Sequence, residues 1–145
     1  MKQVKKRKQS LLDTFETTYN LTHNAKVTTY IQTYIDCEVS AQKLIRYYKK
    51  DIGRKAPARL YLPNILKTVD HFGLKVDRSL IFRIFPGGEG LRNKKSPRQL
   101  RNAYVHKKHP QDCLEMLATF DRHLAWMRVW LDAIESYAKN LINPD

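Results

Sequence analysis

The sequence predicts an all-α protein, an irregular bundle of four to six helices of which two are long. Through most of the 145-residue chain, apolar residues recur every three or four positions, which is the spacing of one face of a helix. Glycine is sparse, at five residues, and apolar residues do not alternate with polar ones as in a strand. We expect one helical domain over residues 10–145, preceded by a basic arm over residues 1–9.

The first third of the chain carries the signals of two helices. Ser10 is a candidate N-cap for the first, and the stretch 20–24 is a plausible break after it. The second and longer helix is expected to run to about Asp51, where Ile52-Gly53 gives a stop signal. The apolar side of the first helix is Leu11, Leu12, Phe15 and Tyr19, and that of the second is Val27, Tyr30, Tyr34, Cys37, Ala41, Leu44 and Tyr48.

The middle of the chain predicts short helices separated by loops. Residues 54–60 are a basic loop, and Pro63 suits the first turn of a helix that ends near Gly73. Asp77 can cap another short helix through its side chain. The sequence PGGEG at residues 86–90 then predicts a loop, and no Gly-Lys-Ser/Thr follows it as in a phosphate-binding P-loop.

The last third begins with Ser96-Pro97, a strong helix start, and this helix is expected to run to about Lys108. Pro110 marks a break or a new first turn, and residues 110–140 then give the longest periodic segment, a helix of roughly 45 Å. One apolar stripe holds Leu117, Phe120, Leu124, Met127, Leu131, Ile134, Ala138 and Leu141, and a second holds Met116, His123, Trp126, Trp130, Ala133 and Tyr137.

The chain is strongly basic, with 27 Lys and Arg residues against 14 Asp and Glu residues and a formal net charge of +13. Such an excess attracts polyanions and strengthens contacts with phosphate groups. Basic residues gather around the candidate site described next, so nucleic acid is the expected partner. A basic surface that serves solubility or meets an acidic partner is the competing interpretation.

The cysteines and the hydropathy of the chain indicate in which cellular compartment the protein is expected. Cys37 and Cys113 are far apart and form no CxxC motif, which favours a reduced, cytoplasmic protein. No run of about eighteen apolar residues is present, so no membrane-spanning helix is expected. Nothing in the sequence calls for a cofactor.

The candidate site is the hexapeptide RNAYVH at residues 101–106. A histidine can move a proton near neutral pH, and an arginine can hold a phosphoryl oxygen through two parallel hydrogen bonds. Asn102 and His106 are four residues apart and share a helical face. Arg101 and His106 are five apart, about 140° around a straight helix. A bend before Pro110, or a two-fold axis that joins two copies of the motif, would bring them to one phosphate.

This order of residues resembles the signature of the HEPN superfamily (higher eukaryotic and prokaryotic nucleotide-binding domains), whose ribonucleases carry Arg, a polar residue, a short spacer and His. The matching residues are Arg101, Asn102 and His106. The resemblance implies a helical bundle with two long helices, and a homodimer in which two motifs form one metal-independent site. It also implies a toxin, abortive-infection protein or CRISPR-linked effector, with an antitoxin or defence complex as a possible partner.

The same resemblance implies attack of a ribose 2′-OH on the adjacent phosphorus, which leaves 2′,3′-cyclic phosphate and 5′-OH ends. His106 would act as general base or acid, and Arg101 would stabilise charge on the non-bridging oxygens. Asn102 would orient the histidine or bond a phosphate oxygen. The residues expected to bind the RNA backbone are Lys107, Lys108, His109, Arg98, Lys94, Lys95 and Arg92.

A zinc site is a second interpretation of the same region. His106, His109 and Cys113 are spaced three and four apart, which suits ligands on one helix, and Cys37 or His123 could complete the set. Cys113 also falls on the apolar side of its helix. No metal is therefore the stronger expectation.

The sequence leaves open whether the motif is catalytic and which residues support it. The chain could be a catalytically silent HEPN-like or other helical module that binds RNA or a nucleotide, or an adaptor; a DNA-binding helical protein has little support. Trp126 and Trp130 are expected at the bundle or dimer contact. Asp36 or Glu38, on the long early helix, could support the site, and the choice between them stays open.

Overall fold

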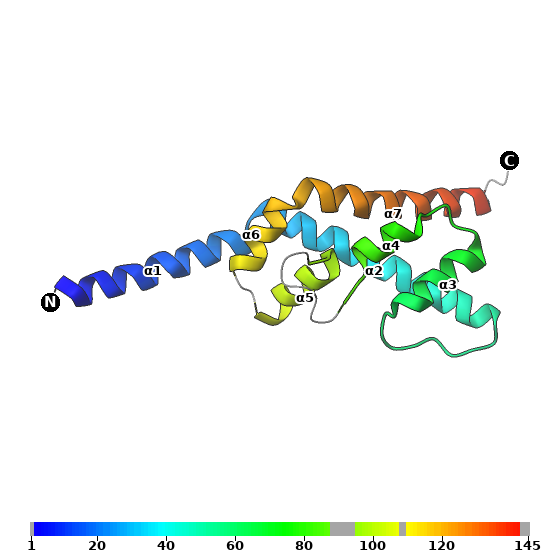
Figure 1. Cartoon of the computed structure of the whole chain (residues 1–145), viewed down its shortest axis with the longest axis horizontal. Coiled ribbons are helices and arrows are strands. Elements are labelled where there is room, and N and C mark those ends of the chain that lie inside the picture. Colours follow the sequence, from blue (N-terminus) through cyan, green and yellow to red (C-terminus); the bar gives the residue numbers. More distant parts are fainter. Residues whose placement is uncertain (1, 88–94, 108–109, 143–145) are drawn as a thin grey trace.

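A computed structural model of the chain describes residues 2–87, 95–107 and 110–142, and within them it contains seven helices and no strand (Figure 1). The side chains of residues 2–10 and 107 are outside this description. The predicted all-α class is confirmed. Among the described helices, none is apolar over enough residues to cross a bilayer. The helices are α1 (Lys2–Thr22), α2 (Ala25–Asp51), α3 (Leu62–Phe72), α4 (Arg78–Ile84), α5 (Pro97–Lys107), α6 (Pro110–Ala118) and α7 (Phe120–Ile142).

The two long helices α2 and α7 lie side by side and contribute much of the core (Figure 1). Helix α3 packs on α2, α4 packs on α7, and α5 and α6 also contact α2. Most of the apolar stripe expected on α2 is buried, while Leu44 and Tyr48 are only partly covered. The buried residues of the pair are Val27, Tyr30, Tyr34, Cys37, Ala41 and Ile45 from α2, and His123, Leu124, Met127 and Trp130 from α7.

Trp130 is the largest fully buried side chain described, and its removal should be costly. Its ring packs edge-on against Phe85 at 4.9 Å between centroids, and its Nε1 donates a hydrogen bond of 3.0 Å to Ser40 Oγ. We expect Trp130→Ala to lower the free energy of unfolding by about 3–5 kcal/mol, because the cavity cannot close fully around the lost ring. Urea denaturation followed by circular dichroism measures this loss.

Trp126, one helical turn earlier, is the matched control. It is only partly buried and stacks on His123 at 4.8 Å between ring centroids. Trp126→Ala should therefore cost clearly less than Trp130→Ala. Equal losses for the two substitutions would contradict this assignment of the core.

Local capping explains why the predicted starts of α2 and α4 and the predicted end of α3 are confirmed. Asn24 Oδ1 accepts a hydrogen bond of 2.8 Å from the backbone N–H of Lys26 at the start of α2. Asp77 Oδ1 accepts one of 3.2 Å from the N–H of Ser79 at the start of α4. Gly73 ends α3 with φ at 63°, a left-handed conformation that residues with a side chain rarely adopt.

The start of α5 is fixed by a reciprocal capping box. Ser96 Oγ accepts a hydrogen bond of 3.2 Å from the N–H of Gln99, and Gln99 Oε1 accepts one of 2.8 Å from the N–H of Ser96. Ser96 Oγ also donates to the carbonyl oxygen of Pro86 at 2.6 Å. The predicted start at Ser96-Pro97 is confirmed, whereas most of the loop expected at 86–90 lies outside the described residues.

The single helix expected over residues 110–140 is wrong, because Thr119 divides it into α6 and α7. The hydroxyl of Thr119 donates a hydrogen bond of 2.7 Å to the carbonyl oxygen of Glu115, one turn earlier. A threonine that bonds back to the preceding turn often bends a helix. Figure 1 shows α6 at a clear angle to α7, and this division accounts for the seventh helix.

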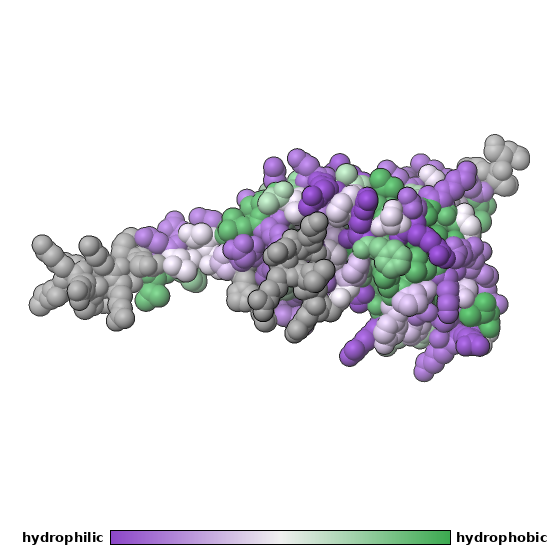
Figure 2. Space-filling view, viewed as in Figure 1, coloured by the Kyte–Doolittle hydropathy of each residue, from purple (hydrophilic) through white to green (hydrophobic). Residues whose placement is uncertain are grey.

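Helix α1 also differs from its prediction, because it begins at Lys2 instead of Ser10. Residues 2–9 are mostly Lys, Gln and Arg, which are good helix formers, and they include no Gly or Pro. The apolar side expected for this helix is between 53% and 72% exposed. Figure 1 shows α1 projecting from the bundle, and Figure 2 shows hydrophobic side chains on the projecting part. The exposed residues are Leu11, Leu12, Phe15 and Tyr19.

Candidate functional site

Helix α5, which carries the hexapeptide 101–106, packs against α2, α4 and α6. It is helical throughout from Pro97 to Lys107, so the bend expected before Pro110 does not fall within these residues; residues 108–109 lie outside the description. Residues five apart on an α-helix differ by about 140° in direction. Arg101 and His106 therefore leave α5 on different faces.

Arg101 points to α2. Its Nη2 donates to Glu38 Oε2 at 2.5 Å, and its Cζ lies 5.2 Å from the centre of the Tyr34 ring. The two charged side chains are only 20% and 18% exposed. A charge-assisted hydrogen bond and a cation–π contact, both partly shielded from water, hold the guanidinium in one place. One of its five N–H groups is used by Glu38, which leaves others for a further acceptor.

A second arginine adds positive charge beside this pair. Arg98 Nη1 donates a hydrogen bond of 3.1 Å to the carbonyl oxygen of Phe85. Burial raises the pKa of the Tyr34 hydroxyl, with Glu38 as a smaller contribution in the same direction, so this phenol stays neutral. Among the described atoms, Tyr34 Oη and the Nε atoms of Arg98 and Arg101 are buried without a hydrogen-bond partner. Such groups retain unused hydrogen-bonding capacity.

His106 lies on the opposite, open side of the last turn of α5. It is exposed, and Asn102, one turn earlier on the same face, is partly buried. Tyr104 Oη donates a hydrogen bond of 3.2 Å to the carbonyl oxygen of Thr22, which ties this turn to the end of α1. An exposed histidine on an anchored helix can reach a substrate or a second protein copy.

The residues predicted to bind RNA fall into two groups. Lys95 Nζ forms an ion pair of 2.9 Å with the buried carboxylate of Asp112, and Arg98 bonds the carbonyl of Phe85, so both have structural contacts. The side chains of Lys107, Lys108, His109, Arg92 and Lys94 lie outside the described residues. The RNA-binding role of the whole set stays a prediction.

Glu38, not Asp36, is the acidic residue that meets the motif. Asp36 accepts a hydrogen bond of 3.0 Å from Gln32 on its own helix and is exposed. Helical spacing could have predicted the choice of Glu38, because Glu38 is four residues after the buried Tyr34 and shares its face. Asp36 is two residues after Tyr34 and points elsewhere.

The residues considered for zinc do not assemble. Within the described part of the chain, no group of three or more His, Cys, Asp or Glu side chains could hold a metal ion. Cys37 and Cys113 are buried free thiols, and burial raises the pKa of each. Cys37 Sγ lies 3.5 Å from the carbonyl oxygen of Met127, and His123 Nδ1 lies 2.6 Å from Tyr30 Oη. His109 lies outside the described residues.

His123 should make the stability of the protein depend on pH. Burial, and secondarily Arg122, lowers its pKa from 6.5 to about 4. Between these two values the unfolded chain binds a proton that the folded chain does not, so the free energy of unfolding falls as the pH falls. We expect a loss of roughly 3 kcal/mol between pH 7 and pH 4, measured by urea denaturation across that range.

The His123→Phe variant isolates this effect, since it keeps a ring in the core but cannot titrate. Carboxylates also titrate near pH 4, and their contribution is common to both proteins. The difference in free energy of unfolding between variant and wild type should change as the pH falls through 6. A constant difference would contradict the assignment.

Comparisons with protein-family models, curated proteins and solved structures find no match to this chain. The function proposed below therefore depends on the side chains and contacts of the chain itself.

Proposed function

We propose that the protein is a metal-independent endoribonuclease whose active site is built from Arg101, Asn102 and His106. The observation that carries the proposal is the fixed position of Arg101, whose guanidinium is held by Glu38 and the Tyr34 ring at the contact between α5 and α2. A guanidinium fixed before the substrate arrives stabilises developing phosphoryl charge without the cost of reorganisation. The net charge of +13 supports an RNA substrate.

The site is completed by a second copy of the chain. Arg101 and His106 lie on different faces of an unbroken helix, so one copy does not direct both side chains at one phosphate. A two-fold axis near α5 would place the exposed His106 of each copy beside the motif of the other. Light scattering should therefore give the mass of a dimer, and a monomer at assay concentration would contradict the composite site.

The proposed reaction is an intramolecular transesterification, in which a ribose 2′ oxygen displaces the 5′ oxygen from the adjacent phosphorus. His106 of one copy takes the proton from a ribose 2′-OH, whose oxygen attacks the adjacent phosphorus. His106 of the other copy gives a proton to the departing 5′ oxygen. Arg101 stabilises the charge on the non-bridging oxygens, and Asn102 orients the histidine on its face of α5. The products carry 2′,3′-cyclic phosphate and 5′-OH ends.

The resemblance of this motif to HEPN ribonucleases also supports a proposal for the biological role of the protein. It favours a cytoplasmic toxin or antiviral-defence effector that an antitoxin or a defence complex holds in check.

The decisive experiment is incubation of the purified protein with RNA in EDTA, with the ends of the products mapped. Fragments with 2′,3′-cyclic phosphate ends support the ribonuclease. Cleavage that disappears in EDTA would contradict a metal-independent mechanism. Tight binding without cleavage would favour the catalytically silent RNA-binding module instead.

A further inference from the structure

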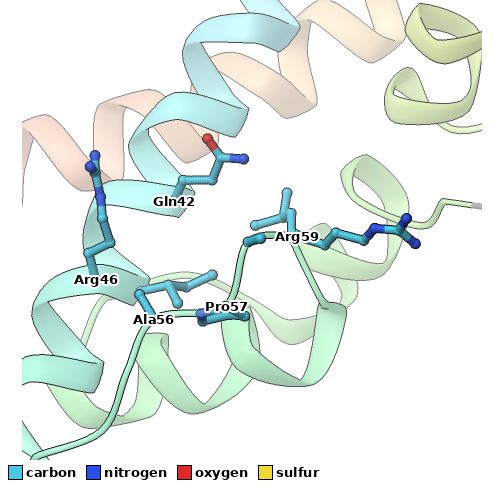
Figure 3. Close-up of a pocket in the computed structure, with 8 residues that line it drawn as sticks. Gln42, Arg46, Ala56, Pro57 and Arg59 are labelled. Atoms are coloured by element: carbon cyan, nitrogen blue, oxygen red, sulfur yellow. The ribbon is translucent and has the colours of Figure 1, made fainter.

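A cavity of about 220 Å³ lies between α2 and the basic loop that precedes α3 (Figure 3). Gln42 and Arg46 border it from α2, and Pro57 and Arg59 border it from the loop. Figure 3 shows the two arginine side chains on opposite sides of Gln42 and pointing in different directions. The guanidinium groups therefore flank the cavity and do not meet at one point.

The electrostatics of this cavity favour an anion. No Asp or Glu is among its lining residues. Within the described part of the chain, neither Arg46 nor Arg59 takes part in an ion pair or hydrogen bond, and both are exposed. Lys43, Arg54 and Lys55 are close in sequence and add positive charge. An exposed guanidinium that no carboxylate holds is free to form two parallel hydrogen bonds with a phosphate.

By helical spacing, the cavity lies one to two turns farther along α2 than Glu38. Glu38, which holds Arg101, is followed at intervals of four residues by Gln42 and Arg46. At 1.5 Å per residue, Arg46 lies about 12 Å along the helix axis from Glu38. A stacked nucleic-acid strand advances about 3.4 Å per nucleotide, so a few nucleotides span this distance.

We propose that Gln42, Arg46 and Arg59 form a second contact with the sugar-phosphate backbone of the RNA strand that Arg101 and His106 engage. This contact rests on the RNA binding of the proposed function. The arginines bind successive phosphates, and the Gln42 amide bonds a phosphate oxygen or a ribose hydroxyl between them. Backbone contacts of this kind fix the position of the strand and do not select its sequence.

The test is the affinity of a fluorescent 12-nucleotide RNA, 2′-O-methylated at every position so that it cannot be cleaved, measured by anisotropy. We expect R46A/R59A to weaken binding at least about tenfold, and to reduce the slope of log affinity against log salt by about 1.4. A dinucleotide, whose single phosphate cannot contact Arg101 and Arg46 at once, should bind both proteins equally. Circular dichroism verifies the fold of each variant.

The matched control is K75A/R128A, which removes the same charge elsewhere. Lys75 borders a different cavity, between the α3–α4 turn and α7, and Arg128 is exposed on α7. This variant should weaken binding of the 12-mer less than about threefold and leave the salt slope almost unchanged. Equal weakening by both double variants would overturn the proposal. So would loss of AMP binding in R46A/R59A with no change for the 12-mer, which would make the cavity a mononucleotide pocket.

The test of this second RNA contact can fail independently of the test of ribonuclease activity. RNA cleavage that depends on His106, together with 12-mer affinity insensitive to R46A/R59A, would overturn only the second contact. The expected affinity changes in a protein that never cleaves RNA would overturn only the ribonuclease.

Discussion

Replacing His106 by alanine should abolish RNA cleavage by the protein while leaving its fold intact. The side chain is exposed at the last turn of α5, so its removal opens no cavity in the core. Loss of a positioned general acid or base lowers rates by about 10²–10⁴-fold, and a dimer loses both roles at once. Denaturing gels of RNA incubated in EDTA measure the rate, and thermal melting confirms that the fold is unchanged.

His71→Ala is the matched control, because it removes a histidine from α3, where His71 pairs with Asp51 at 3.0 Å. Its cleavage rate should equal that of the wild type. Full activity in His106→Ala would rule out the proposed mechanism.

Mixing wild-type and His106→Ala subunits tests the composite site directly. When two histidines from two copies are required, only dimers of two wild-type subunits are active, so an equimolar exchanged mixture keeps about a quarter of the activity. Independent sites would keep about half.

Replacing Glu38 by glutamine should reduce both the stability of the protein and its rate of RNA cleavage. The substitution keeps the size of the side chain but leaves the partly buried charge of Arg101 without its partner. Breaking a fully buried ion pair costs about 3–5 kcal/mol, and partial exposure reduces the expected loss here to about 2 kcal/mol. Cleavage should fall at least about tenfold, because a guanidinium free to rotate stabilises the transition state less.

Asp36→Asn is the control for this effect, since it removes the same charge from the same helix. Asp36 is exposed and bonded only to Gln32 among the described contacts, so the free energy of unfolding should change by less than about 0.5 kcal/mol. Chemical denaturation and the EDTA cleavage assay, run on both variants, give the comparison. Equal effects of the two substitutions would show that Glu38 does not position Arg101.

Helix boundaries were predictable where a single side chain determines them. Asn24, Asp77 and Ser96 each accept a hydrogen bond from a backbone N–H within three residues. The local sequence is therefore enough to predict that a helix starts at each of them. The bend at Thr119 was not, because apolar spacing continues through it and threonine is tolerated within helices. The long start of α1 was unpredictable for a similar reason, since nothing in residues 2–9 distinguishes a charged arm from a charged helix.

The candidate site was only half predictable. Its residues on α5 are adjacent in sequence, whereas the contact of Arg101 with Glu38 joins residues 63 positions apart. Such a contact depends on how α5 packs on α2. Helical spacing could only favour Glu38 over Asp36 as the acidic residue, because Glu38 lies beside the buried residues of α2. The five-residue interval alone predicted that His106 and Arg101 lie on different faces of α5, whereas the exposure of His106 is known only from the structure.

The hydrogen bond from Ser96 to Pro86, together with that from Arg98 to Phe85, fastens the two ends of the intervening segment to each other. Doubling the length of a loop with fixed ends costs only about 0.6 kcal/mol. Because Ser96 and Arg98 bond to the carbonyl groups of Pro86 and Phe85, we expect the helices to keep their positions when residues are inserted between positions 88 and 94.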